Sequence, residues 1–289
     1  MGEGMKTGLL ILTFLAGALV SSHGQVIVLK DGKRVTAKAL RRVGDNIMAT
    51  APTAEGAAAV NGEVGYPLAQ IETLEFPEPS ILKAAPDMIA KGNQAGVIAQ
   101  LDAALNYFGG FRDAPGNYWG ELALLKLTAL VTSNKDPEAE PLANQVVSQA
   151  SNPETVRAAQ AHLAGIVGRK GDHERAIQLC DKVLKDGTRP DTLAIAVMSK
   201  GRNHQALKQW DAALLAYLNI PVFYPEEKMF LPQYMLGAGQ CYFELNDLQR
   251  AKDSLNELIK SFPNSAEATQ AMTELDKIAR REKALETVQ

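Results

Sequence analysis

The chain has 289 residues, of which 46% are hydrophobic, 22% charged and only 6% aromatic, and its formal net charge is -3 at pH 7. This length and apolar content are enough for one substantial core or two small domains. Because a slightly acidic chain lacks the general positive charge that attracts nucleic acids, we predict no nucleic-acid partner.

Residues 1–24 have the layout of a secretory signal peptide, with a basic residue, an uncharged apolar run over 8–20 and small residues at the predicted cleavage site. The run is too short for a lasting transmembrane helix, which needs about 20 residues. No cysteine stands next to the cleavage site, so no lipid anchor is predicted. We expect an exported protein, periplasmic or secreted, with an uncleaved membrane anchor as the alternative. The start codon, Met1 or Met5, stays open.

Residues 25–76 carry the pattern of a small antiparallel β domain. Apolar runs at 26–29, 35–40 and 47–51 are separated by turns that contain glycine. The alanine-rich stretch 53–60 has no firm period and is predicted to be a loop or a weak edge hairpin. We therefore predict a barrel-like or rolled-up meander.

Six basic residues gather at the start of this domain against one acidic residue, Asp31, which gives a local net charge of +5. They are Lys30, Lys33, Arg34, Lys38, Arg41 and Arg42. The functional interpretation is attraction to an anionic envelope polymer or membrane surface. The alternative is protection of an exposed strand edge, where lysines discourage pairing with another sheet.

A proline-rich linker over 77–80 ends the β domain, because proline cannot donate to a strand ladder and restrains the residue before it. From 81 to 289 the pattern is helical. We predict a first helix pair over 81–108, a degenerate second pair over 119–150, three clearer pairs after it, and a polar capping helix over 266–285.

The most informative feature is a helix-pair pattern that recurs three times in the second half of the chain. Ala176, Ala213 and Ala251, which open the second helix of each pair, are 37 and 38 residues apart. Gly201 and Gly239 are small residues at the expected crossing of the two helices of a pair. A fixed period of this size predicts an α-solenoid of about five pairs, in which each unit buries its apolar face against a neighbour.

In these residues the chain resembles the tetratricopeptide repeat family, with copies at about 154–190, 191–226 and 231–265. The usual period of the family is about 34 residues, so each copy here is a few residues longer. Longer repeats of this kind are similar to those of bacterial periplasmic and outer-membrane-associated members, such as the Tol-Pal-associated cell-division coordinator and the outer-membrane assembly lipoprotein.

The resemblance implies a concave groove lined by the first helices of successive pairs, and the helical phase of Gly201 and Gly239 selects its residues. The predicted groove residues are Arg169 at the edge, Met198, Arg202 and Gln205 in one wall, and Gln233, Leu236 and Gln240 in the next. Such side chains suit an extended or helical peptide. The alternative is that they are ordinary exposed helix residues.

A second candidate surface is the connection NIPVFYPEEKMF, which holds Phe223, Tyr224 and Phe230. Exposed apolar clusters are uncommon on monomers and mark interaction sites. The alternative is that the rings pack under the connection and seal adjacent helices.

The sequence shows no arrangement of catalytic residues, so we predict no enzyme, no metal and no cofactor. His162, His173 and His204 have no metal-type partner at helical spacing. Cys180 and Cys241 should be separated by a whole helix pair, which exceeds the roughly 7 Å between Cα atoms that a disulfide allows.

Two classes of function stay open. The favoured one is a non-catalytic exported scaffold or adaptor that binds a protein partner in the groove, in a bacterial envelope assembly. The alternative is binding of a cell-wall or anionic polysaccharide by the basic β domain, with the repeats as a spacer or oligomerisation module. The partner and the oligomeric state, a homo-oligomer included, are left open.

Overall fold

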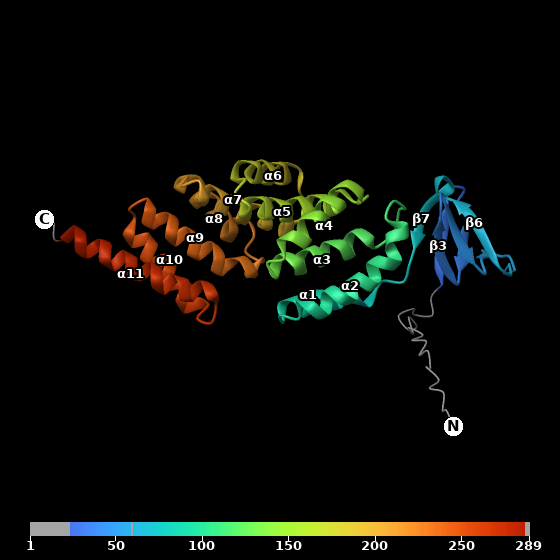
Figure 1. Ribbon diagram of the computed structural model, residues 1–289, viewed down its shortest axis with the longest axis horizontal. Coiled ribbons are helices and arrows are strands. Elements are labelled where there is room, and N and C mark those ends of the chain that lie inside the picture. Colours follow the sequence, from blue (N-terminus) through green and yellow to red (C-terminus); the bar gives the residue numbers. More distant parts are fainter. Residues whose placement is uncertain (1–23, 59, 287–289) are drawn as a thin grey trace, which may run out of the picture. The chain divides into compact units, whose positions relative to one another are not determined.

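The computed structural model describes residues 24–58 and 60–286. The predicted signal peptide lies outside these residues except for Gly24. The chain divides into two compact units, Met1–Ser80 and Ile81–Gln289. The first holds the strands and the second the helices (Figure 1).

The β unit consists of two antiparallel sheets. The four-stranded sheet has the order β5-β2-β1-β7, with β1 at Gln25–Leu29, β2 at Arg34–Ala37, β5 at Thr53–Ala54 and β7 at Ile71–Glu75. The three-stranded sheet has the order β3-β4-β6, with β3 at Ala39–Val43, β4 at Asn46–Thr50 and β6 at Glu63–Pro67. The two-residue strand β5 pairs at an edge, which agrees with the expectation of a weak edge hairpin over 53–60.

The chain passes from one sheet to the other at Lys38, between β2 and β3. The prediction of one strand over 35–40 is therefore wrong in this detail. Val35 and Ala37 are buried in alternation, but the next buried residue is Leu40, so the alternation shifts by one position. Side chains of one strand alternate between two faces, and such a shift means that the strand has ended.

Eleven α-helices and a short 3-10 helix at each of two connections make up the described part of the second unit. The first four α-helices are α1 (Ser80–Ala90), α2 (Gln94–Phe108), α3 (Trp119–Thr132) and α4 (Asp136–Gln149). The next four are α5 (Pro153–Arg169), α6 (His173–Asp186), α7 (Pro190–Ala206) and α8 (Trp210–Phe223). The last three are α9 (Leu231–Glu244), α10 (Leu248–Ser261) and α11 (Ala266–Glu286). The 3-10 helices are η2 (Gly109–Phe111) and η3 (Lys228–Phe230).

Each of the five helix pairs turns at one residue in the left-handed backbone region. These residues are Gly92, Asn134, Gly171, Lys208 and Asn246, with φ between 55° and 93°. Gly and Asn adopt this region with little strain, whereas lysine does so rarely. In three of the pairs an Asn or Asp follows the turn and caps the second helix by accepting a backbone N–H. From Asn134 onward these turn residues are 37, 37 and 38 residues apart, so the same turn marks each successive pair.

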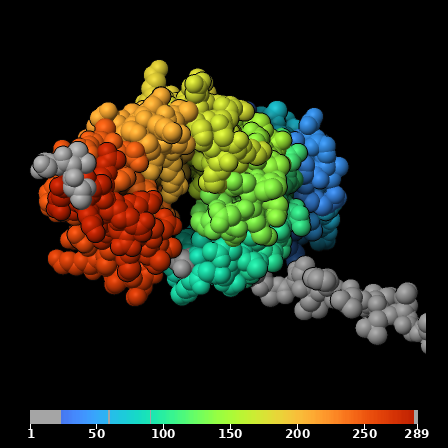
Figure 2. Space-filling view, turned by 60° about the vertical axis from the view of Figure 1, so that its left-hand side comes forward, coloured from blue at the N-terminus to red at the C-terminus, as the bar shows by residue number. Residues whose placement is uncertain are grey.

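The pairs stack so that their first helices meet. Contacts run from α3 to α5, from α5 to α7, from α7 to α9 and from α9 to α11, whereas the second helices make no comparable contacts with one another in the described part of the chain. Figure 2 shows the segments following one another in sequence order from green to red. First helices that lie closer together than second helices form the concave side of a solenoid. The predicted fold, an α-solenoid of about five pairs after a small antiparallel β domain, is confirmed.

The tightest packing in the solenoid surrounds the ring of Tyr217 on α8. A Cβ atom added to Gly201 of α7 would lie 2.6 Å from a ring carbon, and one added to Gly237 of α9 would lie 2.5 Å from another. Tyr217 is 2% exposed, so the ring has nowhere to move. Gly239 has the equivalent role in the next pair, where an added Cβ would lie 2.8 Å from Leu255. The expectation that Gly201 and Gly239 occupy the crossings within pairs is confirmed.

We expect Gly237→Ala to lower the free energy of unfolding by about 1–3 kcal/mol, because the added methyl group overlaps the enclosed ring of Tyr217. Urea unfolding followed by circular dichroism measures the change. Gly109→Ala is the matched control, since a Cβ there meets nothing within 4 Å, and it should change the value by less than about 0.5 kcal/mol. Equal effects of the two changes would contradict this account of the packing.

Candidate functional site

The groove of the solenoid contains a cavity of about 240 Å³ between α7, α9 and α11. Its lining residues are Arg202, Gln205, Tyr217, Gln233, Leu236, Gly237, Gln240, Glu267 and Gln270. Five of the seven residues that the sequence places in the groove are among them. We refer to this site as the groove cavity.

A row of hydrogen bonds crosses the groove from one first helix to the next. Gln205 Nε2 donates to Gln240 Oε1 at 2.7 Å, and Gln240 Nε2 donates to Glu274 Oε1 at 3.0 Å. At one end the hydroxyl of Tyr217 donates to Gln205 Oε1 at 2.7 Å. At the other end Lys277 pairs with Glu274. Because Gln205, Gln240 and Glu274 are 35 and 34 residues apart, this row, which we call the amide ladder, joins equivalent places in successive pairs.

Arg202 is the basic residue in the lining of the groove cavity, which also contains the acidic Glu267. Its side chain is exposed and donates to Gln233 Oε1, and no carboxylate of the described residues lies within ion-pair distance of it. Burial against the surrounding protein lowers the pKa of its guanidinium, and the charge of Glu267 opposes this shift. Arginine stays protonated in proteins. An exposed residue that the surrounding protein partly desolvates lies in a concave surface, so the groove cavity contains a cation without an ion pair among the described residues, with Glu267 in the same lining.

Arg169, predicted at the edge of the groove, has a structural partner. Its Nε and one terminal nitrogen donate to the two carboxylate oxygens of Asp136 at 2.7 and 2.6 Å. This two-point hydrogen bond lowers the pKa of the Asp136 carboxyl. The pair connects α5 to the start of α4, so Arg169 is less available to a partner than Arg202.

Met198 is not in the groove, contrary to the prediction. It is 1% exposed and belongs to the core cluster that also contains Val197, Tyr217 and Cys241. Met198 stands three residues before Gly201, which packs against Tyr217, so both face α8. Helical phase alone does not separate Met198 from the groove residues, because at 3.6 residues per turn it lies between Gln205 and Arg202 around α7.

The three aromatic residues of the connection after α8 behave differently from one another. Phe223 is 66% exposed, Tyr224 is half-buried and Phe230 is buried against the core. The predicted exposed aromatic patch is therefore wrong for Phe230, which seals adjacent helices. It holds for Phe223.

Four of the six basic residues of the β unit are ion-paired. Arg34 on β2 pairs with Glu75 on β7 across the intervening strand β1, and Arg41 on β3 pairs with Glu63 on β6 across β4. Arg42 pairs with Asp45, and Lys33 with Asp31. Strand pairing brings these carboxylates, which are distant in sequence, next to the arginines. The local charge of +5 counted along the sequence is thus largely neutralised in space, and Lys30 and Lys38 are left without a carboxylate partner among the described residues.

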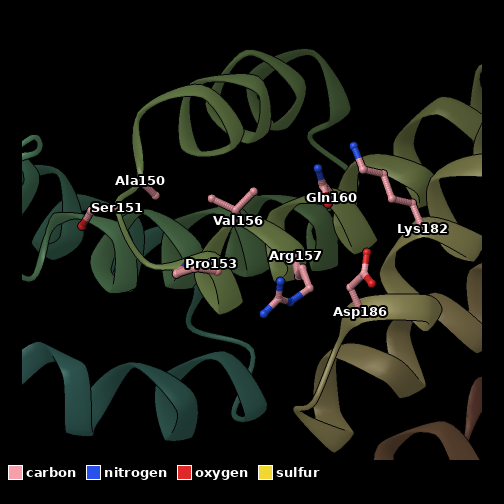
Figure 3. Close-up of a pocket in the computed structure, with 8 residues that line it drawn as sticks. All are labelled: Ala150, Ser151, Pro153, Val156, Arg157, Gln160, Lys182 and Asp186. Carbon is pink, nitrogen blue, oxygen red and sulfur yellow. The ribbon is translucent and has the colours of Figure 1, made fainter.

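A second cavity, of about 390 Å³, opens where α4 ends and α5 and α6 pack together. Figure 3 shows Val156, Arg157 and Gln160 of α5 beside Lys182 and Asp186 of α6. Arg157 is already held by Glu154 at 2.5 Å, and the nearby charge of Asp186 also raises its pKa. Because Arg157 is engaged, Lys182 is the cation that this cavity leaves for a ligand, beside the carboxylate of Asp186.

The other side chains that could carry chemistry, the two cysteines and the possible metal ligands, do not form a reactive site within the described residues. Cys180 and Cys241 are buried free thiols, and burial raises their pKa values to about 11 and about 12, which makes them unreactive. Within the part of the chain that the structure describes, no three His, Cys, Asp or Glu side chains come together as metal ligands would. The described helices include none with the length and apolar character needed to cross a membrane.

Sequence reasoning missed the residues that complete the groove cavity from α11 and α8. Glu267 and Gln270 of the cavity lining, and Glu274 of the amide ladder, lie on α11, for which the sequence predicts a capping helix. Tyr217 lies on a second helix. The period contains a signal for Glu274, since it follows Gln240 by nearly the same interval that separates Gln240 from Gln205. No comparable signal marks Tyr217, whose hydroxyl reaches the groove through the gap that two glycines leave.

Comparison with known proteins identifies the fold of the helical unit. Residues 233–265, which include most of α9 and all of α10, match the family model of the tetratricopeptide repeat. No curated protein matches the chain. This match shows one repeat that is similar to the tetratricopeptide repeat.

Two solved structures share this fold at low sequence identity. A thermophilic tetratricopeptide repeat protein of Thermus thermophilus has 13% identity and a TM-score of 0.53, over 68% of this chain and 97% of that one. The Cut9–Hcn1 hetero-tetramer of APC/C has 15% identity and a TM-score of 0.55, over 69% of this chain and 36% of the other. A tetratricopeptide repeat protein of Parabacteroides merdae is matched at 17% identity over 56% of this chain and 60% of that chain, with a TM-score of 0.42.

We expect acid to weaken this fold through His162, which is buried in α5 beside Thr128. Burial, with the charge of Arg169, lowers the pKa of His162 to about 4 from the ordinary 6.5. Between these pH values the unfolded chain binds a proton that the folded chain does not, so stability falls as the pH drops from about 6.5 to about 4. The full loss corresponds to about 3 kcal/mol.

Urea unfolding at pH 7 and at pH 4.5, compared between the wild type and His162→Gln, measures this contribution. The carboxyl groups affect both proteins equally, so the difference isolates His162. If the two proteins lose the same free energy on acidification, His162 is not a buried neutral histidine.

Proposed function

We propose that this protein is a non-catalytic scaffold that binds a segment of a partner protein in the groove of its solenoid. The observation that carries the proposal is the groove cavity, where Arg202 is an exposed cation without a carboxylate partner among the described residues. A tetratricopeptide-like fold places such residues on a preformed concave surface, which is typical of interaction scaffolds.

The polar groups of the groove cavity favour a ligand rich in hydrogen-bond acceptors. Each carboxamide has two N–H donors, and Gln205 and Gln240 each use one of them in the amide ladder. Gln233 is an acceptor for Arg202, so its own N–H donors are free for a ligand. Main-chain carbonyl groups of an extended segment are acceptors at regular intervals, and they fit these donors.

The apolar part of the cavity is small. Leu236 lines it but is only 8% exposed, and Tyr217 reaches it with its hydroxyl group. Affinity would therefore come from a few anchors, Arg202 first among them, rather than from apolar area. A carboxylate or a run of peptide carbonyls over Arg202 would gain a charge-assisted hydrogen bond.

The sequence supports a place for this scaffold in the bacterial envelope. Residues 1–24 have the layout of a secretory signal peptide, and no cysteine for lipid attachment stands next to the cleavage site. The long repeat period resembles that of envelope proteins such as the Tol-Pal-associated cell-division coordinator. We therefore propose a periplasmic or secreted protein that acts in an envelope assembly.

The alternative, polysaccharide binding by the β unit, has less support, because only Lys30 and Lys38 of the six basic residues stand without a carboxylate partner among the described residues. Co-sedimentation of the fragments 25–76 and 80–289 with purified wall polymer separates the two functions. Retention of the small fragment alone would favour the alternative.

We expect Arg202→Ala combined with Gln240→Ala to weaken partner capture at least tenfold, because it removes a charge-assisted hydrogen bond and breaks the amide ladder. The assay immobilises the purified protein and quantifies what it retains from an envelope extract of the source cells. The helical circular dichroism should stay unchanged.

The matched control is Gln178→Ala combined with Lys185→Ala on the exposed side of α6, which removes the same kinds of side chain outside the groove. A photo-crosslinker placed at the exposed Gln270 should link the retained protein, and one at Gln178 should not. Unchanged capture by the groove variant would show that the partner does not bind in the groove.

A further inference from the structure

The exposed face of α8 is apolar, which sets it apart from the rest of the solenoid. Leu215, Val222 and Phe223 are each 66% exposed, and Met229 in the following connection is 62% exposed. Leu215 and Val222 are seven residues apart, so they share one stripe of the helix. The opposite side of α8, with Ala213, Tyr217 and Ile220, is fully packed.

The equivalent helices of the neighbouring pairs show that the fold does not require this face. When α6, α8 and α10 are aligned at their opening alanines, the three exposed apolar positions of α8 correspond to polar or charged residues in both other helices. They are Gln178, Lys185 and Asp186 in α6 and Asp253, Lys260 and Ser261 in α10. Apolar residues at three positions that are exposed and polar in the equivalent helices indicate a surface that another molecule covers in the functional protein.

Four charged residues bracket the apolar face. Lys208 and Asp211 lie at the start of α8, and Glu226 and Lys228 lie just beyond its end. All four are exposed, and none of them takes part in an ion pair within the described part of the chain. The start of the face thus presents one acidic and one basic group, and the end presents one basic and two acidic groups, because the half-buried Glu227 stands between Glu226 and Lys228.

We propose that a second copy of this chain covers this face, through antiparallel packing of α8 against α8 about a two-fold axis near Leu218. An axis there places Leu215 of one copy opposite Val222 of the other. It also brings Lys208 towards Glu226 of the second copy, and Asp211 towards Lys228. A two-fold contact must be complementary to itself, with each pairing made twice, and the order of these four charges satisfies this condition.

The arrangement matches the usual anatomy of a protein interface, with an apolar centre and a charged rim. The charged pairs at the rim favour antiparallel packing. In a parallel arrangement each charged residue would lie opposite the same residue of the second copy, and the two like charges would repel. The face lies on a second helix, whereas the groove cavity is lined mainly by first helices. A dimer through α8 therefore leaves both grooves open, and its existence does not depend on the proposed function.

The test is sedimentation equilibrium of the purified full chain over a hundredfold range of concentration. The wild type should approach twice the chain mass as the concentration rises. Leu215→Asp, Val222→Lys and Phe223→Ser together, which install the residues of α10, should give the single-chain mass throughout. Thermal unfolding by circular dichroism of this variant at low concentration should match that of the monomeric wild type, which shows that it folds.

Charge exchange tests the direction of packing. Lys208→Glu and Glu226→Lys should each weaken association at least tenfold, and the two together should restore it, because the pair is reversed but kept. The matched control is Lys185→Ala on α6, which should leave association unchanged. A wild type that stays at the single-chain mass, an apolar-face variant that still dimerises, or a double charge variant that associates no better than either single one would overturn the proposal. The first result would assign the face to a different protein.

Discussion

The enclosure of one tyrosine ring between two glycines holds the functional half of this solenoid together. Tyr217 projects from α8 into the space that Gly201 of α7 and Gly237 of α9 leave, so three helices from two pairs meet at one side chain. Protein interiors are close-packed, and a ring that fills such a gap sets the distance between the helices. The hydroxyl of Tyr217 then reaches the groove and holds Gln205 in place. The same side chain therefore decides both the packing of the core and the geometry of the amide ladder.

The polar contacts along the solenoid follow the repeat as closely as the apolar ones do. Gln205, Gln240 and Glu274 are joined at intervals of 35 and 34 residues, and Arg169 reaches Asp136 over 33. Such contacts connect each pair only to its neighbours, as in a structure that extends in one dimension. Arg202 breaks this order, because its charge meets an amide rather than a carboxylate. Two surfaces are not explained by packing alone: the groove, where Arg202 has no ion pair among the described residues, and the exposed apolar face of α8.

Much of the groove could be predicted from the sequence, because helical phase relates every residue of a helix to a known packed one. Gly201 fixes the phase of α7 and places Arg202 and Gln205 at the groove, but the same phase also places Met198 there, and only its packing against Tyr217 and Ile220 of α8 puts it in the core. Other features could not be predicted in this way. Glu63 and Glu75 neutralise Arg41 and Arg34 only because antiparallel strands bring together residues 22 and 41 positions apart. Local charge along a chain says little about charge in space when partners come from distant strands.

By itself the sequence determined the periodic elements of this protein. Recurrence at 37 and 38 residues, turn residues such as Gly171 and Asn246, and the 3.6-residue period of apolar side chains are local properties, and local properties predict helix pairs that stack. Only the tertiary structure decided which polar side chains remain without partners, that Phe230 is buried while Phe223 is exposed, and that the hydroxyl of Tyr217 reaches the groove. These outcomes depend on distances between residues on different helices. Such distances follow from how closely the helices approach, and that approach is settled by the side chains that fill the space between them.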